Sequence, residues 1–304
     1  MRVLITGATG FLGTRLVARL IDAGHEVCAV VRASSRTELI AGLGADCRVA
    51  SLVTGEGLAH ALRDVDVVVH AAGGGRNRTT AQMYADNRDT TQCLLDACAG
   101  LPLKRFVHVS SLAATGPSQD GAAPADRAPT SHYGRSKAAA EDAVLAVAEQ
   151  LPVTILRPCA VYGPGDVAMA PLFKLAGKGW LLLPGPGQGT AFVHVQDCIS
   201  ALMATIEQDH PSGRVYGVAE RTVRNVELPE IMATATGSTL RVVRIPGLLL
   251  RFLGLFWDKA ADLSQPWWIC ESAGLRDDFG WEPQVPVEVG FVETMAWYRE
   301  EGWV

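Results

Sequence analysis

The sequence lacks the long apolar runs and basic stretches that mark two large classes of protein. No uninterrupted apolar stretch reaches the roughly 18 residues that a transmembrane helix needs, so no membrane span is expected. The 27 lysines and arginines are outnumbered by 32 aspartates and glutamates, and no basic stretch stands out. The net charge of −5 therefore argues against a nucleic-acid partner.

Paired cysteines are also missing. The seven cysteines, at positions 28, 47, 93, 98, 159, 198 and 270, form an odd set without C-x-x-C spacing. Their places in apolar segments predict reduced thiols, a cytoplasmic location and no metal site. The first predicted strand starts at residue 2, which leaves no room for a signal peptide before it.

One pair of residues suggests chemistry. Tyr133 and Lys137 stand four positions apart, so on a helix their side chains share one face. A nearby ammonium group favours the phenolate form of a phenol, and such a phenol can exchange a proton with a substrate oxygen near neutral pH. The same spacing is common on ordinary amphipathic helices, so the pair alone predicts no activity.

The opening of the chain adds a dinucleotide site to this pair. Residues 2–5 form an apolar run typical of a buried parallel strand, and residues 14–23 place apolar side chains at helical spacing. Glycines between them allow a sharp turn, a close approach of pyrophosphate and a helix N-terminus that faces the anion. The predicted cofactor contacts in this turn are Gly7, Thr9, Gly10, Phe11, Leu12 and Gly13.

The end of the second predicted strand, residues 26–31, indicates which dinucleotide fits. An acidic residue there would bind the ribose 2′-hydroxyl of NAD. This chain has Arg32 instead, with Arg36 shortly after it, where a 2′-phosphate would lie. The pattern predicts NADP, with NAD as the alternative. Two ordinary arginines in a solvated loop would give the same sequence pattern.

Alternating strand and helix patterns predict an α/β fold, a doubly wound parallel sheet of the Rossmann type. Expected strands are 46–52, 66–70, 105–109 and 153–156, and expected helices are 58–62, 79–98 and about 133–149. After residue 157 the pattern breaks into Gly- and Pro-rich turns. We therefore expect a dinucleotide-binding domain over 1–165, with a return at 192–218, and a smaller substrate-binding domain over 166–304.

Ser111, at the end of the 105–109 strand, completes a constellation with Tyr133 and Lys137. Together they resemble the extended branch of the short-chain dehydrogenase/reductase superfamily, the NAD-dependent epimerase/dehydratase family. The similarity extends over nearly the whole chain, in segments 68–72, 133–137, 156–164, 192–197 and 275–298 and around Asn87.

The resemblance implies roles. Tyr133 would be the acid/base, Lys137 would hold the nicotinamide ribose and favour the phenolate, and Ser111 would hydrogen-bond the substrate oxygen. Ser110 is the less favoured serine. For Asn87, a structural role as a helix N-cap or at a helix kink is as good an interpretation as a contact with the cofactor. The further cofactor contacts that the resemblance implies are Ala71, Ala72, Gly73, Asn87, Pro158 and Ala160, beside Tyr133 and Lys137.

Departures from the family pattern reduce the number of family activities that fit this chain. Ser51 stands where many relatives place an aspartate against adenine, and Ser111 is followed by Leu112-Ala113 rather than the Asp-Glu pair of dehydratases. Thr190 occupies the place of an arginine that epimerases use to hold a diphosphate. Losing such a charge-assisted contact costs about 1.5–3 kcal/mol, so a nucleotide-sugar substrate is disfavoured.

Residues 245–257 are dense in apolar side chains, and Pro266-Trp267-Trp268-Ile269 follows. The segment 248–257 is expected to be a buried or cleft-lining helix, with contact to a membrane surface as the lesser alternative. It looks similar to that of dihydroflavonol reductase-like and 3β-hydroxysteroid dehydrogenase-like relatives, whose substrates are largely apolar. His70, His108 and His194 are expected to be hydrogen-bonded core residues, and Asp197 a structural residue that begins or caps the helix after His194.

The sequence thus predicts an NADP-dependent oxidoreductase that interconverts a carbonyl and a secondary alcohol on a moderately apolar small molecule, a ketone or an alcohol. One alternative is a sugar or nucleotide-sugar epimerase with tightly held NAD(P). Another is a non-catalytic NAD(P)-binding sensor or assembly factor. The sequence is compatible with a homodimer.

Overall fold

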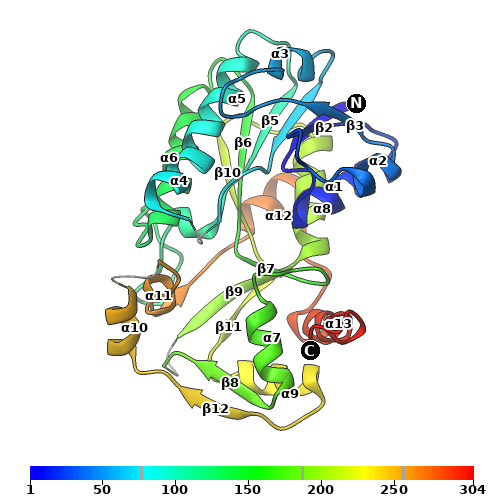
Figure 1. Ribbon diagram of the computed structural model, residues 1–304. Helices are drawn as coiled ribbons and strands as arrows, with labels where there is room; N and C mark the ends of the chain where they lie inside the picture. Colours follow the sequence, from blue (N-terminus) through cyan, green and yellow to red (C-terminus); the bar gives the residue numbers. More distant parts are fainter. Residues whose placement is uncertain (76–77, 186–187, 255–257) are drawn as a thin grey trace.

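A parallel sheet of seven strands, in the order β10-β6-β5-β4-β1-β2-β3, occupies the upper part of the molecule (Figure 1). The structure is a computed structural model that describes residues 1–75, 78–185, 188–254 and 258–304. The strands are β1 (Arg2–Thr6), β2 (Glu26–Val31), β3 (Asp46–Val49), β4 (Val67–His70), β5 (Arg105–Val109), β6 (Val153–Pro158) and β10 (Arg214–Val218). The strand order reverses between β1 and β4, which is where such sheets bind ligands.

Helices cover both faces of this sheet, which explains why its central strands are apolar throughout. Val3 and Ile5 pack into one core, with helices α1 and α8, and Leu4 packs into the other, with α5 and α6. The first layer holds α1 (Phe11–Asp22), α2 (Glu38–Gly42), α8 (Val195–Glu207) and α12 (Ala273–Phe279). The second holds α3 (Leu58–Ala61), α4 (Thr80–Tyr84), the π-helix η1 (Ala85–Asp89), α5 (Thr90–Cys98) and α6 (His132–Ala146).

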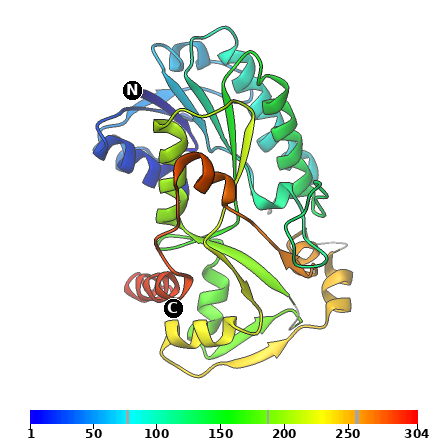
Figure 2. The same cartoon turned by 180° about the vertical axis from the view of Figure 1, so that it is seen from behind.

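Two small sheets form the lower part of the molecule (Figures 1 and 2). In one, β9 (Gly189–His194) pairs with β7 (Ala160–Tyr162), β11 (Arg221–Arg224) and β13 (Trp267–Trp268). In the other, β8 (Trp180–Leu183) pairs with β12 (Arg241–Arg244). Their helices are α7 (Ala170–Gly177), α9 (Leu228–Thr236), α10 (Gly247–Gly254), α11 (Asp258–Leu263) and α13 (Val287–Glu300).

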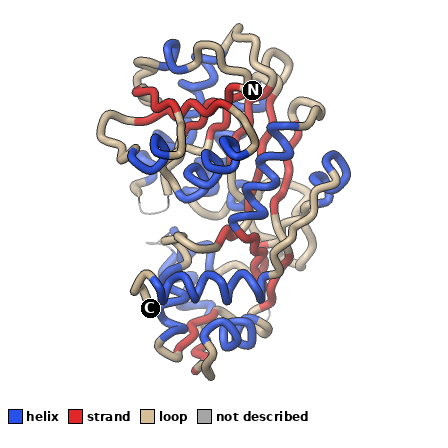
Figure 3. The backbone as a smooth tube through the Cα atoms, turned by 90° about the vertical axis from the view of Figure 1, so that its right-hand side faces the viewer, coloured by secondary structure: helices blue, strands red, loops and turns tan. Residues whose placement is uncertain are grey.

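Aromatic side chains form the core of this lower part. Phe291, on α13, contacts Tyr162 with ring centroids 4.7 Å apart and Phe173 at 5.2 Å. Figure 3 shows α13 lying along this part, near the end of the chain. Edge-to-face contacts of this kind add to the free energy of apolar burial, so α13 is held firmly against β7 and α7.

The predicted fold is confirmed, with differences at its margins. The strand expected over 46–52 ends at Val49, and the helix expected over 79–98 contains the π-helical turn η1. The division into domains 1–165 and 166–304, with the return at 192–218, stays a prediction; α12, from the last third of the chain, packs against β10 of the large sheet. Among the described residues, no helix is long and apolar enough to cross a membrane.

The expectation of a buried helix over 248–257 is wrong for its described residues, whereas a cleft-lining helix and contact with a membrane surface stay predictions. Residues 255–257 lie outside the part that the structure describes. In α10 only Leu250 is buried; Leu248, Leu249, Phe252 and Leu253 are exposed. The helix therefore does not form core with these side chains.

Candidate active site

The glycine turn between β1 and α1 packs so closely that side chains are excluded from it. Gly7 has φ +72°, and a Cβ there would lie 2.7 Å from the backbone of Ala71 and Ala72, at the end of β4. A Cβ at Gly13 would collide with the carbonyl oxygen of Gly7. These contacts let α1 begin directly above the sheet edge, beside residues 71–72.

The start of α1 has the donors that a pyrophosphate requires. Gly10 is the N-cap, in extended conformation, and within the described chain no side chain caps it. The first turn carries no acidic residue, so its N–H groups and the positive end of the helix dipole face the sheet edge unopposed. Thr9 and Gly10 are exposed there. This donor set fits the anionic bridge of a dinucleotide.

Arg32 and Arg36 follow the end of β2 on an exposed turn. The Arg32 N–H donates to Ser35 Oγ at 3.1 Å, and the Ser35 N–H donates to the Arg32 carbonyl at 2.9 Å. Both guanidinium groups are exposed, and neither is paired with a carboxylate of residues 1–75, 78–185, 188–254 or 258–304. Two unpaired cations in this place suit a phosphate group.

Helix α6 carries Tyr133 and Lys137 on one face. Its N-cap, Ser131, accepts a hydrogen bond from the Gly134 N–H at 3.1 Å. Tyr133 is half-buried, whereas Lys137 is only 6% exposed and its Nζ donates to the Val109 carbonyl at 3.0 Å. The ammonium group is therefore fixed at the last residue of β5, two residues before Ser111.

Close packing brings Ser111 to the same helix. Ser111 caps the short 3-10 helix η2 (Leu112–Ala114), accepting from the Ala113 N–H at 3.2 Å. A Cβ at Gly134 would collide with the carbonyl oxygen of Ala113, so only glycine lets α6 approach η2 this closely. The structure thus brings together the elements that carry the three predicted catalytic residues; their roles stay predictions.

Asn87 links the cofactor side of the sheet to α6. It lies in η1 and is 1% exposed; its Nδ2 donates to Ser136 Oγ at 2.9 Å, and its Oδ1 accepts from the Gly74 N–H at 3.1 Å. A Cβ at Gly73 would lie 2.6 Å from Asn87 Oδ1 and 3.2 Å from Lys137 Nζ. Asn87 is not an N-cap. It lies within the π-helical turn and holds residues 73–74 beside Lys137.

Pro158 and Ala160 flank the point where the chain leaves the large sheet. Pro158 ends β6, Ala160 begins β7, and between them the Cys159 N–H donates to the Val218 carbonyl at 3.1 Å. Both residues therefore lie at the carboxyl end of β6, between the upper and lower parts of the molecule.

Glu141 is a site residue that the sequence analysis missed. Its carboxylate is fully buried and accepts from Ser110 Oγ at 2.5 Å and from Arg157 Nε and Nη2 at 2.8 and 2.7 Å. Arg127 adds a contact at 3.2 Å. Glu141 thereby ties α6 to the residue before Ser111 and to the residue before Pro158. Its spacing of four from Lys137 is the signal that could have found it.

A second missed residue, Asp258 of α11, places a carboxylate at the N-terminus of α6, the helix that carries Tyr133 and Lys137. Its carboxylate oxygens accept from the backbone N–H groups of His132 at 2.7 Å and Tyr133 at 3.1 Å. The first turn of α6 has no acidic residue of its own, so Asp258 supplies the negative charge that a helix N-terminus favours. A cap from 125 positions away leaves no local signal in the sequence.

The three histidines are buried, but only His70 is hydrogen-bonded as expected. Its Nδ1 and Nε2 lie 2.7 Å from Thr6 Oγ1 and 3.0 Å from Thr91 Oγ1, and burial lowers its pKa to about 3. The ring nitrogens of His108 and His194 have no hydrogen-bond partner within the described residues, which corrects the expectation. Burial lowers the pKa of both rings below that of a free imidazole.

Asp197 is structural, although it does not cap its own helix. It lies in the first turn of α8 and accepts from the N–H groups of Gln284 at 2.9 Å and Val285 at 3.0 Å. It therefore fixes the segment that leads into α13. Over the described chain, no group of three or more His, Cys, Asp or Glu could hold a metal ion.

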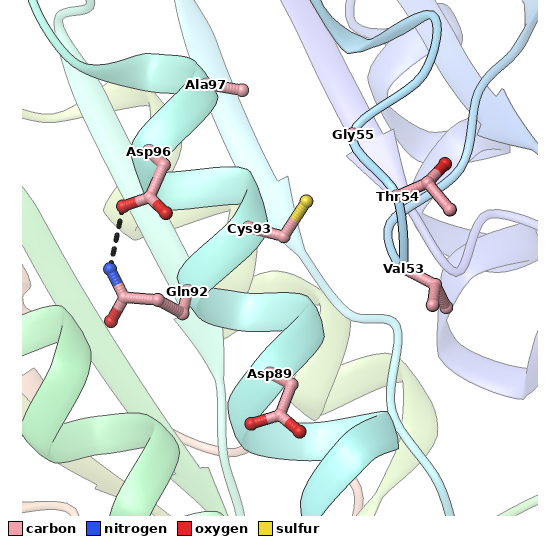
Figure 4. A pocket seen from close by; sticks show the side chains of 8 residues that line it. All are labelled: Val53, Thr54, Gly55, Asp89, Gln92, Cys93, Asp96 and Ala97. Carbon is pink, nitrogen blue, oxygen red and sulfur yellow. Dashed lines mark hydrogen bonds between the residues drawn. The ribbon is translucent and has the colours of Figure 1, made fainter.

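A surface hollow of about 450 Å³ lies between α5 and the loop after β3 (Figure 4). Gln92 Nε2 donates to Asp96 Oδ1 at 2.8 Å on its rim. Its lining contains none of the predicted site residues, so the hollow is separate from the site described above.

Comparison with known proteins finds a matching family and relatives that cover nearly the whole chain. A family model described as the NAD dependent epimerase/dehydratase family matches residues 3–219. The ceramide reductase of Caulobacter vibrioides (strain NA1000 / CB15N) is 30% identical, over 99% of this chain and 96% of that protein. The 2-alkyl-3-oxoalkanoate reductase of Stenotrophomonas maltophilia (strain K279a) is 29% identical, over 97% and 99%.

A solved structure matches the whole fold. DesIV, a dTDP-glucose 4,6-dehydratase from Streptomyces venezuelae with NAD and TYD bound, has a TM-score of 0.81 and 27% identity. The match covers 100% of this chain and 98% of that one.

Proposed function

This chain belongs to the NAD-dependent epimerase/dehydratase family of extended short-chain dehydrogenases/reductases, and on that premise we propose that it reduces an apolar ketone with NADPH. The observation that carries the proposal is the anchoring of Lys137, whose Nζ is held at the Val109 carbonyl one helical turn from Tyr133. A protein that only bound the cofactor would not need a buried ammonium on the same helix face as a half-buried phenol.

Each of the predicted site residues has a separate role in a carbonyl reduction. A bound nicotinamide supplies the hydride. Ser111 donates a hydrogen bond to the ketone oxygen, which stabilises the negative charge that develops there. Tyr133 then gives its phenolic proton to that oxygen, and the Lys137 ammonium stabilises the phenolate that remains. The glycine turn and the start of α1 bind the pyrophosphate, and Gly73, Asn87, Pro158 and Ala160 line the rest of the cofactor path.

NADP is favoured over NAD by Arg32 and Arg36. Their exposed, unpaired guanidinium groups follow β2, where the 2′-substituent of the adenosine ribose lies in this fold. A bidentate contact between arginine and phosphate is among the stronger hydrogen-bonded pairs in proteins. No carboxylate competes for either group within the described chain.

The side chains on and next to β9 support an apolar substrate. Thr190 stands where epimerases present an arginine, and β13 pairs Trp268 beside it in register. The Trp267 ring lies against Gly121 and Gly189, so an indole ring covers the start of β9. The names of the two reductases given above indicate a ceramide and 2-alkyl-3-oxoalkanoates as their substrates. From them we infer a lipid-like ketone as the substrate of this chain.

A substrate panel tests the proposal. The purified protein is mixed with NADPH and with a long-chain 3-oxo acid, a 3-oxo sphingolipid or UDP-glucose, and the nicotinamide absorbance is followed. Loss of absorbance with a long-chain ketone and not with UDP-glucose is the expected result. Epimerisation of UDP-glucose without net consumption of NADPH would replace the proposal with the epimerase alternative, and NADPH binding without turnover on any substrate would favour the sensor.

A further inference from the structure

The outward face of α10 is apolar, the reverse of what a helix on a water-facing surface shows. Leu248 is 80% exposed and Phe252 60%, while Leu250, on the opposite side, is 4% exposed. At 100° per residue, positions 248, 249, 252 and 253 fall within one arc of about 140°. All four are leucine or phenylalanine and all four are exposed.

The same surface continues over the small β8–β12 sheet. In its register Val243 lies beside Leu182, and Arg241 lies beside Trp180. These side chains are exposed, and the Arg241 guanidinium lies over the Trp180 ring, 5.4 Å from its centroid. Figures 1 and 2 show β12 leading directly into α10 along the lower edge of the molecule. We call the exposed residues of β8, β12 and α10 the lower apolar surface.

The elements of this surface carry cations and no carboxylate. Together β8, β12 and α10 contain Arg241, Arg244 and Arg251 and neither aspartate nor glutamate, in a chain of net charge −5. Arg251 lies on the flank of the apolar arc of α10 and is itself exposed. Apolar side chains flanked by cations are what a helix lying on an anionic bilayer presents.

We propose that the lower apolar surface docks on a membrane that contains anionic lipids, with α10 lying in the interfacial plane. Its leucines and phenylalanine enter the boundary between headgroups and acyl chains, and the arginines meet lipid phosphates. A second copy of this chain fits less well, because a two-fold interface would bring the same arginines of both copies together without a carboxylate between them.

This surface is connected to the catalytic helix. Helix α11 begins four residues after α10 ends, and its first residue, Asp258, bonds the backbone of His132 and Tyr133. The docked face would therefore hold the start of α6 near the bilayer, where an apolar ketone is dissolved. This last step rests on the proposed function; docking itself does not.

Vesicle co-sedimentation tests docking without any substrate. The full chain is mixed with vesicles of phosphatidylcholine alone or of phosphatidylcholine with phosphatidylglycerol, at low and at high salt. We expect binding to the anionic vesicles that weakens with salt. Leu248→Ser together with Leu249→Ser should lower the partition coefficient at least about tenfold, because two apolar side chains no longer enter the acyl-chain boundary. Arg251→Glu should lower it about fivefold or more at low salt.

The matched control changes exposed apolar residues elsewhere, Leu39→Ser with Val53→Ser, which should bind vesicles as the unchanged chain does. Circular dichroism and NADPH binding of every variant report whether it folds. The proposal is overturned if the unchanged chain does not bind anionic vesicles, or if the α10 variants bind as well as the control. A dimer in solution that the α10 variants split, without vesicle binding, would assign the surface to a second copy instead.

Discussion

Replacement of Glu141 by leucine should damage both stability and turnover. The carboxylate is fully buried and receives four hydrogen bonds, from Ser110, twice from Arg157 and from Arg127. Leucine leaves the Arg157 guanidinium, 18% exposed, without its counter-charge. Removing one partner of a buried ion pair costs about 3–5 kcal/mol, so the free energy of unfolding should fall by that amount.

The same change should reduce kcat. Glu141 holds the residues that precede Ser111 and Pro158, so its loss lets both strand ends move relative to α6. A misplacement of about 1 Å at reacting groups costs up to 10²-fold in rate. We expect kcat to fall about tenfold to a hundredfold with little change in the Kd for NADPH, because the glycine turn lies on another strand.

Urea denaturation and steady-state kinetics measure the two effects. The control is Asp142→Asn, the next residue on α6, whose side chain is 60% exposed and pairs with Arg127. It should cost at most about 1 kcal/mol, as exposed ion pairs do. Arg157→Met in the Glu141→Leu background should recover part of the lost stability, since it removes the unpaired charge. A Glu141→Leu variant no less stable than the Asp142→Asn control would refute the reasoning.

Three further predictions concern the cofactor, the cap and pH. Arg32→Ala with Arg36→Ala should raise the KM for NADPH by about tenfold or more and leave that for NADH unchanged; equal effects on both would remove the 2′-phosphate contact. Asp258→Ala, which removes the carboxylate bonded to the first two N–H groups of α6 and leaves the Ser131 N-cap in place, should lower the unfolding free energy by about 1 kcal/mol, while Asp277→Ala, at an exposed position of α12, should not. Burial raises the pKa of Glu220 to about 7 from its usual 4.5, so its contribution to stability is present below about 4.5 and is lost as pH rises through 7. Glu220→Gln should therefore gain stability relative to the unchanged chain between pH 5 and 8, and a constant difference across that range in urea titrations would contradict the assignment.

Much of the fold could be predicted because it depends on patterns of residues that are close in the sequence. The apolar run of β1, the glycines at 7, 10 and 13 and the helical spacing of α1 each follow from residues close in sequence. The parallel order of the sheet follows from the alternation of strands and helices. Strand ends were less predictable: β3 stops at Val49 because pairing with β2 ends there, which depends on a neighbouring strand.

The parts of the site that could not be predicted depend on contacts across the fold. Glu141 meets Ser110 and Arg157 because β5 and β6 are adjacent under α6, and Asp258 reaches Tyr133 through the path of the chain after α10. The exposure of Leu248 was missed for the same reason: an apolar helix is buried by default, and only tertiary structure shows which of its side chains remain exposed. Tyr133, Lys137 and Ser111 could be selected because strand ends and helical spacing place them without such knowledge.

The proton-donor role of Tyr133 is tested most directly by comparing Tyr133→Phe with the unchanged chain in two measurements, the Kd for NADPH and kcat for a long-chain ketone. We expect an unchanged Kd and a kcat lowered by about 10²-fold or more, because the phenylalanine ring keeps the packing and lacks only the hydroxyl proton. A variant that binds NADPH and turns the ketone over at the original rate would contradict it.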